Sequence, residues 1–307
     1  MYEVLMYDGG VYRSDELYEL IDDVGGVVIN KSRSQQMLMV TMAIPGEEVP
    51  VLERFCHEIG GITKEVPLAG TEIAVVGPTL GRHHMPHPIC DIAEQLRQLG
   101  AITVVMGLAR GRGKERSQIM AEEKAIINEY DAAIFMLGNF KSCVESKKHL
   151  FDQIEKPVVL VTGAKPEGLD QDCEAIISGI GRKSERMRRP EERKKLDETA
   201  EATVQVVKDR RRVIEEDPLF VHPAEIKQLL EDIDAVSYNL RPAPIVLHLD
   251  GLRVKIPYKE HVKELEEIQI YGRRLGDVAE IKPSRISDSS TIIRILSRSE
   301  VEYKDQV

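Results

Sequence analysis

Two cysteines that follow short apolar runs are the side chains most able to carry chemistry in this sequence. Cys90 comes after the segment HHMPH at residues 83–87, and Cys143 comes after GNFKS at residues 138–142. Each falls at a predicted helix start, where unpaired backbone N–H groups and the helix dipole favour the thiolate. A thiolate binds iron or copper, and it also attacks electrophiles. The pair therefore predicts a metal centre or a nucleophile, and electrostatics does not separate these two uses.

The elements around these cysteines predict that the two meet. Short apolar runs, separated by helical stretches, lie at residues 73–76, 103–107, 133–137 and 158–161. This rhythm predicts a parallel sheet covered by helices on both faces. In the doubly wound order 2-1-3-4 the first and third strands are neighbours, and ligands bind where the order reverses. Cys90 follows the first strand and Cys143 follows the third, so we expect the two cysteines on opposite sides of one crevice.

Histidines, arginines and small residues complete the predicted site. The candidate metal ligands are Cys90, Cys143, His84 and His87. The predicted surroundings of the bound group are Arg82, His83, Arg110, Gly138 and Asn139. The arginines could meet an anionic ligand, and Gly138 permits close approach of the backbone. Alternatively, the histidines orient their neighbours or face solvent.

The remaining cysteines point to structure rather than chemistry. The four cysteines lie far apart with no CxxC pair, which argues against a disulfide framework and a self-contained zinc knuckle. Cys56 falls on an apolar helical stripe, and we expect it to be buried. Cys173 lies in a polar stretch and is expected to be exposed or interfacial.

The order of elements predicts an α/β protein with three parts. Residues 1–68 read as a ferredoxin-like βαββαβ plait, and residues 69–181 as a Rossmann-like domain with the candidate cluster site. Residues 182–307 read as a charged helical segment and a small α+β domain. The charged segment is interpreted as a solvated face, or as a docking surface for an acidic partner. No GxGxxG follows the first strand and no GxxxxGK[ST] occurs, so we expect no bound nucleotide.

Composition excludes several other classes of function. The net charge of −10 argues against sequence-blind nucleic-acid binding. No run approaches the roughly 18 apolar residues of a membrane span. The first residues show no export signal, so the expected location is cytoplasmic, with no membrane partner.

Long blocks of this sequence resemble a family of methanogenic archaea, methanogenesis marker protein 7. The matching blocks are MYDGGVY at residues 6–12, the segment at 67–101, GLARG at 107–111 and DAAIFMLGNFKSC at 131–143. The block GRHHMPHPICDIAEQLR at residues 81–97 is also similar to methyl-coenzyme M reductase operon protein C. The resemblance covers roughly the first half to two thirds of the chain.

The resemblance implies a subunit of the ATP-dependent assembly that reductively activates methyl-coenzyme M reductase, whose nickel tetrapyrrole must reach Ni(I). The implied partners are operon protein C, other methanogenesis marker proteins, an ABC-type ATPase component and the reductase itself. The implied cofactor is a complex, nitrogenase-like iron–sulfur cluster, carried here by Cys90 and Cys143 with His84 or His87. Two cysteines are fewer than a Cys₄ site offers, so the cluster is shared with a partner or completed by other ligands.

Three functional hypotheses follow. The first is an electron-transfer or cluster-holding subunit without catalytic activity of its own. The second is an enzyme in which Cys90 is the nucleophile and His84 or His87 the base. The third is an assembly scaffold without its own metal.

Overall fold

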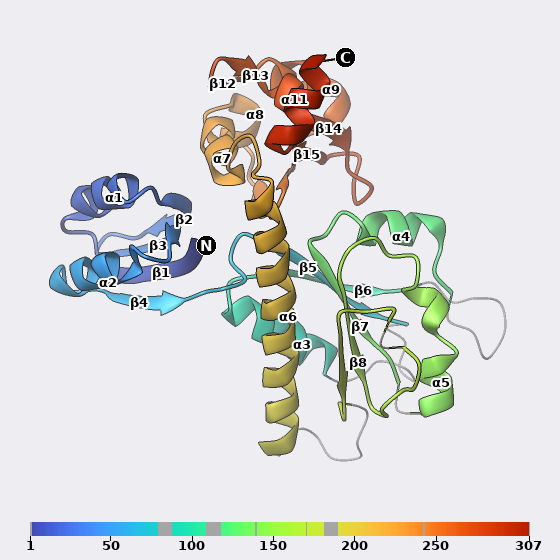
Figure 1. The fold of residues 1–307 in the computed structure, drawn as a ribbon. Coiled ribbons are helices and arrows are strands. Elements are labelled where there is room, and N and C mark those ends of the chain that lie inside the picture. Colours follow the sequence, from blue (N-terminus) through green and yellow to red (C-terminus); the bar gives the residue numbers. More distant parts are fainter. Residues whose placement is uncertain are drawn as a thin grey trace.

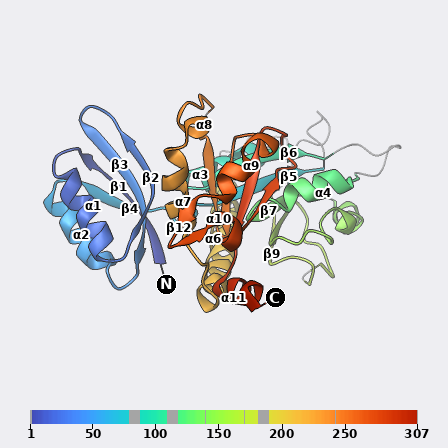
Figure 2. The same ribbon diagram turned by 90° about the horizontal axis from the view of Figure 1, so that it is seen from above.

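One long helix lies between the antiparallel and parallel sheets of this molecule. The computed structural model describes residues 2–78, 88–108, 118–138, 140–169, 171–180, 190–241 and 243–306. Helix α6 (Pro190–Glu216) forms a column between the N-terminal and central sheets, and the C-terminal part lies at its end (Figure 1). Seen from above, the N-terminal and central sheets lie on either side of the C-terminal part (Figure 2). The predicted division at residues 68 and 181 stays a prediction.

The N-terminal part has the predicted βαββαβ order. Its elements are β1 (Tyr2–Gly10), α1 (Ser14–Asp23), β2 (Val27–Arg33), β3 (Met37–Pro45), α2 (Val49–Glu58) and β4 (Ile62–Glu65). The strands form an antiparallel sheet in the order β2-β3-β1-β4. Leu5 and Tyr7 of β1 pack under the two helices, and Gly61 leaves the space that the Tyr7 ring occupies. Cys56 is buried in the same core, as predicted, and burial raises the pKa of its thiol to about 11.

The central part is the predicted parallel sheet with one additional strand. Its elements are β5 (Glu72–Gly77), α3 (Ile89–Gln98), β6 (Ile102–Gly107), α4 (Ala121–Ile127), β7 (Ala132–Met136), α5 (Lys141–Glu145), a 3-10 turn (Lys148–Leu150), β8 (Val158–Thr162) and β9 (Ala175–Ser178). The strand order is β6-β5-β7-β8-β9, which contains the expected 2-1-3-4 arrangement. The inner strands β5, β7 and β8 are buried on both faces, which explains their continuous apolar sequences.

Helix α6 covers part of this central sheet, so the expectation of a solvated charged helix is wrong for its middle turns. Thr199, Ala200, Thr203, Val206 and Val207 are buried, and the three apolar ones join the core on the α3 face. The hydroxyl groups of Thr199 and Thr203 donate to backbone carbonyls one turn earlier, so they enter the core without unpaired donors. Alanine, threonine and valine side chains form this stripe, and Leu196 of the same helix packs against the same core.

The C-terminal part is a second antiparallel sheet with helices. Its elements are α7 (Pro223–Glu231), α8 (Asp234–Ser237), β10 (Ile245–His248), β11 (Gly251–Val254), α9 (Tyr258–Glu266), β12 (Gln269–Ile270), β13 (Arg273–Arg274), α10 (Leu275–Val278), β14 (Ala279–Pro283), β15 (Thr291–Ile295) and α11 (Arg298–Gln306). The main sheet has the order β10-β11-β15-β14, and its first hairpin is the predicted one. Val4, Ile29 and Ala43 of the N-terminal sheet share its core. The predicted mixed α/β class is confirmed, and none of the helices described here is long and apolar enough to cross a bilayer.

Candidate functional site

The strands that precede the two predicted site cysteines end at the same edge of the central sheet. β5 and β7 pair in parallel from Ile73 opposite Ala132 to Val76 opposite Phe135, so their carboxyl ends lie side by side. The order reverses here, because β6 lies beyond β5 while β8 lies beyond β7. This carboxyl edge of the sheet, defined by the ends of β5 and β7, is the predicted crevice position.

The helices that carry the two cysteines leave this edge on opposite faces of the sheet. Ile89 and Ile92 of α3 pack in the core that includes α6, whereas Val144 of α5 packs in the core on the other face. Cys90 lies in the first turn of α3, as predicted, and its side chain is exposed. Cys143 lies in α5, and its side chain is outside the described residues. The meeting of the two sulfur atoms therefore stays a prediction.

Most of the other predicted site residues also fall outside the described residues. These are Arg82, His83, His84, His87, Arg110 and Asn139. Over the described ranges, no group of three or more His, Cys, Asp or Glu side chains is placed to hold a metal. The exposed Cys90 thiol suits the role of one ligand. The other ligands of a metal would have to come from Cys143, from the segments not described, or from another subunit.

Lys147 is a charged group at this edge that the sequence analysis missed. It lies two residues after the end of α5, and the residue is only 8% exposed. Its Nζ lies 3.9 Å from the position that a Cβ atom on Gly138 would occupy, just beyond the end of β7. Gly138, one of the predicted surroundings, thus lies beside the Lys147 side chain. The sequence gives no signal for this, since Lys147 and Lys148 look alike in it.

A second buried charge belongs to Glu192, in the first turn of α6. The residue is 6% exposed, and its Oε2 atom has no hydrogen-bond partner among the described residues. α6 follows β9 and its last turns reach the opposite edge of the sheet, where Arg211 donates to the carbonyl oxygens of Pro67 and Ala69. Helix α6 therefore begins on the carboxyl side of the sheet, and Glu192 lies on that side.

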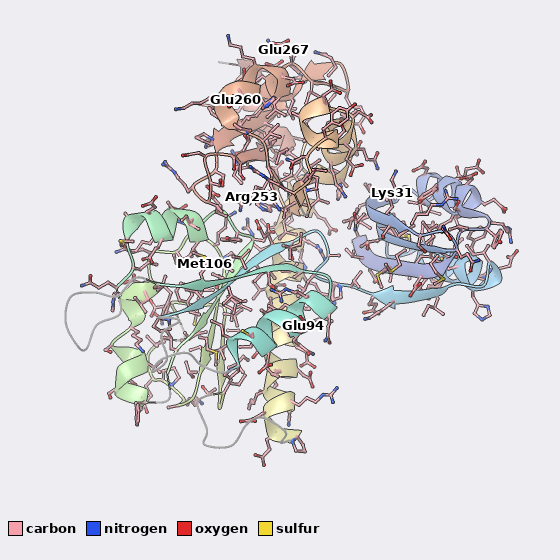
Figure 3. All side chains as sticks on the ribbon, turned by 180° about the vertical axis from the view of Figure 1, so that it is seen from behind. Lys31, Glu94, Met106, Arg253, Glu260 and Glu267 are labelled. Atoms are coloured by element: carbon pink, nitrogen blue, oxygen red, sulfur yellow. The ribbon has the colours of Figure 1, made fainter. Side chains whose placement is uncertain are left out.

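The amino edge of the same sheet holds a buried network of charges. Glu72 opens β5, and its Oε2 lies 2.9 Å from His248 Nε2 and 2.8 Å from Arg253 Nη2. Arg253 Nη1 also donates to Glu129 at 2.7 Å and to the Ser284 hydroxyl at 2.8 Å. The network joins the central sheet to the hairpin of the C-terminal part, and Figure 3 shows Arg253 at that junction.

Electrostatics within this amino-edge network stabilises the charged form of Glu72. Burial alone would raise the pKa of Glu72, but the hydrogen bond from His248 and the charge of Arg253 outweigh it, so the pKa is lowered. At Asp131 burial prevails over the charge of His248, and the pKa of its carboxyl is raised. Asp131 accepts hydrogen bonds from the backbone N–H groups of Glu72 and Leu249, each at 2.8 Å. These contacts indicate that the amino-edge network is a structural joint, which holds the C-terminal part against the central sheet.

Comparison with known proteins identifies the family. The family model described as methyl-coenzyme M reductase operon protein C matches residues 2–268 of the chain. The chain belongs to this family. The sequence analysis had placed it nearest to methanogenesis marker protein 7, with a block similar to operon protein C, and the family model matches the latter.

One relative and two solved structures complete the comparison. The protein named Uncharacterized protein MJ0094, from Methanocaldococcus jannaschii, is 40% identical over 305 residues and covers 99% of this chain and 97% of its own length. A crystal structure of a hypothetical protein is 20% identical, with a TM-score of 0.22, and covers 47% of this chain and 71% of that one. A phospho-2-dehydro-3-deoxyheptonate aldolase from Thermotoga maritima is 12% identical, with a TM-score of 0.18, over 53% and 62%. Neither solved structure is similar enough to carry an argument about the fold.

The range matched by the operon protein C family extends well past the resemblance seen in the sequence. It includes both cysteines of the predicted site, Lys147, and the amino-edge residues Glu72 and Arg253. It ends at Ile268, before Ser284. Both edges of the central sheet therefore lie within the part that the family model describes.

Proposed function

We propose that this chain is a non-catalytic subunit of the assembly that reductively activates methyl-coenzyme M reductase, and that it holds or shares an iron–sulfur cluster for electron transfer. Its family is named for the operon of that reductase, which supports an action on or beside the enzyme. The resemblance to methanogenesis marker protein 7 adds the reductive activation step, in which the nickel tetrapyrrole reaches Ni(I).

The observation that carries this proposal is the exposed Cys90 thiol at the point where the strand order reverses. Open parallel sheets bind ligands at such points. Cys90 and Cys143 are the proposed thiolate ligands, and His84 or His87 the proposed imidazole ligands. An iron–sulfur cluster would supply one-electron transfer, and the protein would set its position and its exposure to solvent.

The proposed partners follow from the small number of cysteine ligands and from the absence of nucleotide-binding motifs in the sequence. Two cysteines require a second protein chain or other ligands to complete a cluster, so we propose that another operon protein C-like or marker protein shares it. Because the sequence contains no phosphate-binding loop, we propose that an ABC-type ATPase component supplies ATP hydrolysis. A cytoplasmic location, with neither a membrane nor a nucleic acid as partner, remains part of this proposal.

The test is metal analysis of the assembled complex purified without oxygen. We expect iron, acid-labile sulfide and broad visible absorbance, with a cluster signal in EPR after reduction. Replacing Cys90 or Cys143 by serine should lower iron and sulfide, because each variant removes one thiolate ligand. Cys56→Ala is the matched control, since Cys56 is buried in the N-terminal core and should not affect metal content.

The same variants separate the competing functions. Wild-type iron content in both serine variants would remove the metal-holding role. If activation of the reductase is also unchanged, the chain is a scaffold. A single cysteine that reacts rapidly with iodoacetamide at neutral pH, together with metal-free turnover of a small electrophile, would instead identify a cysteine-nucleophile enzyme.

A further inference from the structure

A large cavity lies at the end of α6, where the N-terminal sheet meets the C-terminal part (Figure 1). Its volume is about 780 Å³, which is within the range of pockets that hold small molecules. Every residue that lines it is within the described ranges. His248 is one of them and pairs with Glu72 at the amino edge of the central sheet, so the cavity is separate from the carboxyl edge.

Most of the cavity wall is apolar. Val4, Ile29 and Leu247 line it from the two antiparallel sheets, and Leu219 and Phe220 line it from the segment after α6. The first three are at most 8% exposed, and the other two are partly buried against the same core. A ligand with an apolar body would remove the remaining apolar surface of this wall from water, which favours binding.

Arg211 adds a positive charge to this apolar wall. Its Nη1 and Nη2 atoms donate to the carbonyl oxygens of Pro67 and Ala69 at 2.7 and 3.0 Å. These two bonds fix the guanidinium without neutralising its charge, and no carboxylate of the described residues forms an ion pair with it. Because a guanidinium has five N–H donors, Arg211 retains donors for a ligand in the cavity that it lines.

His222 supplies a second donor on the same wall, at the start of α7. Its Nδ1 accepts a hydrogen bond from the backbone N–H of Ala224 at 3.1 Å, so the proton of the neutral ring is on Nε2. Burial lowers the pKa of His222, and the nearby charge of Arg211 acts in the same direction. The Nε2 atom has no hydrogen-bond partner among the described residues and is not fully buried, so it is open to a ligand.

The acidic side chains of the wall limit the charge that a ligand can carry. Glu215 accepts a hydrogen bond from the backbone N–H of Tyr2 at 3.2 Å, and Glu225 accepts one from the Tyr271 hydroxyl. Both carboxylates lie on the cavity wall, as does the exposed Glu302. They would repel a multiply charged head group, so a singly charged anion fits this cavity better.

We propose that this cavity binds an amphipathic small molecule that has one carboxylate and an apolar chain. The carboxylate binds to Arg211, whose planar guanidinium can donate to both carboxylate oxygens, and the His222 Nε2–H group donates as well. The apolar chain packs on Leu219, Phe220 and Leu247. This site is independent of the proposed function, because it uses neither cysteine of the proposed cluster.

The first experiment measures binding of octanoate to the metal-free, full-length chain by isothermal titration calorimetry. We expect one site per chain. Hexanoate should bind about tenfold more weakly, because it has two fewer methylene groups to bury. Uncharged 1-octanol has the same chain as octanoate, and it should bind at least tenfold more weakly because it lacks the carboxylate.

Two pairs of variants locate the carboxylate and the chain. Arg211→Gln should weaken octanoate binding about tenfold and leave octanol binding unchanged, whereas Arg212→Gln, which alters an exposed neighbour, should bind both as the wild type does. Ile214 lines the cavity, and the adjacent Val213 is 53% exposed outside it. Ile214→Trp should therefore weaken binding of both ligands about tenfold, and Val213→Trp should not.

His222→Asn tests the second donor without removing the cap of α7, because asparagine is a favoured residue at that position. It should weaken octanoate binding about fivefold. If Arg211→Gln does not fold, His222→Asn and the comparison of octanoate with octanol still test recognition of the carboxylate.

Three results would overturn the proposal. The first is that octanoate does not bind to the wild-type chain. The second is equal octanoate binding by Ile214→Trp and Val213→Trp, which would place the site elsewhere. The third is octanol binding as tight as octanoate binding, or equal octanoate binding by Arg211→Gln and Arg212→Gln, which would remove the carboxylate from the recognition. Because the chain is metal-free in these measurements, none of these results bears on the proposed cluster.

Discussion

Buried charged groups have partners at the amino edge of the central sheet, whereas at the carboxyl edge a buried carboxylate oxygen has none within the described residues. At the amino edge Glu72, Arg253 and Glu129 form ion pairs, and the buried Asp131 accepts two backbone hydrogen bonds. At the carboxyl edge the buried Glu192 Oε2 has no hydrogen-bond partner within the described ranges.

This difference separates a structural joint from a candidate binding site. A buried charge is tolerated when the fold itself provides the opposite charge, as at the amino edge. Where the described part of the fold does not provide it, a ligand is the natural source. Perturbed and unpaired charges cluster at functional sites for this reason. The comparison assigns the structural joint to Glu72 and Arg253, whereas the carboxyl edge remains the candidate site of the proposed function.

Breaking the amino-edge network should have the largest effect on stability. Arg253→Met removes the arginine that pairs with the buried Glu72 and donates to Glu129. We expect the free energy of unfolding, measured by guanidinium titration, to fall by about 3–5 kcal/mol.

The control for this variant is an exposed arginine in the same C-terminal part. Arg274 pairs with Glu267 and Asp277, and its side chain is 53% exposed. Arg274→Met should change the free energy of unfolding much less than Arg253→Met does, because solvent screens exposed ion pairs. Equal costs for Arg253→Met and Arg274→Met would show that the amino-edge network does not act as a joint.

The fold was predictable from the sequence where apolar patterning and topology rules apply. Continuous apolar runs predicted four parallel strands, and the doubly wound rule predicted their order. The short strand β9 (Ala175–Ser178) was missed because its apolar run is short and follows a polar stretch. The buried stripe of α6 was missed because alanine and threonine side chains among many charged residues give little hydrophobic signal.

The position of Cys90 was predictable, but the charges of both edges were not. Pro88 and the following apolar periodicity place Cys90 at a helix start, which the structure confirms. Glu72 and Arg253 are 181 residues apart in the chain, and no local pattern links them. Lys147 differs from Lys148 only through the way the chain folds back after α5, which periodicity does not reveal.

The carboxyl groups of Glu72 and Asp131 at the amino edge should affect the pH dependence of stability with opposite signs. The pKa of Glu72 is lowered in the folded state, so its contribution is present above its unfolded pKa and is lost as pH falls through the folded value. The pKa of Asp131 is raised in the folded state, so folding favours its protonated form. Its contribution to stability therefore increases as the pH falls.

Urea titrations between pH 7 and pH 3 test this contrast. Glu72→Gln should lower the free energy of unfolding at pH 7 by about 1–3 kcal/mol. It should also make the further loss of stability below pH about 4.5 smaller than in the wild type. Asp131→Asn should make that acid loss steeper, because it removes the group with the opposite sign. The same pH profile for both variants would contradict these assignments.

The smallest expected effect concerns Glu192, and its sign is opposite to that of Arg253. Glu192→Met removes a buried oxygen that no described group satisfies, and it retains the length of the side chain. The free energy of unfolding of the metal-free chain should therefore rise by about 1 kcal/mol. Glu191→Met is the matched control, because Glu191 is the exposed neighbour on the same helix and should change stability by less than about 0.5 kcal/mol. If Glu192→Met is instead less stable than Glu191→Met, the carboxyl edge compensates its charges internally, and the contrast between the two edges is lost.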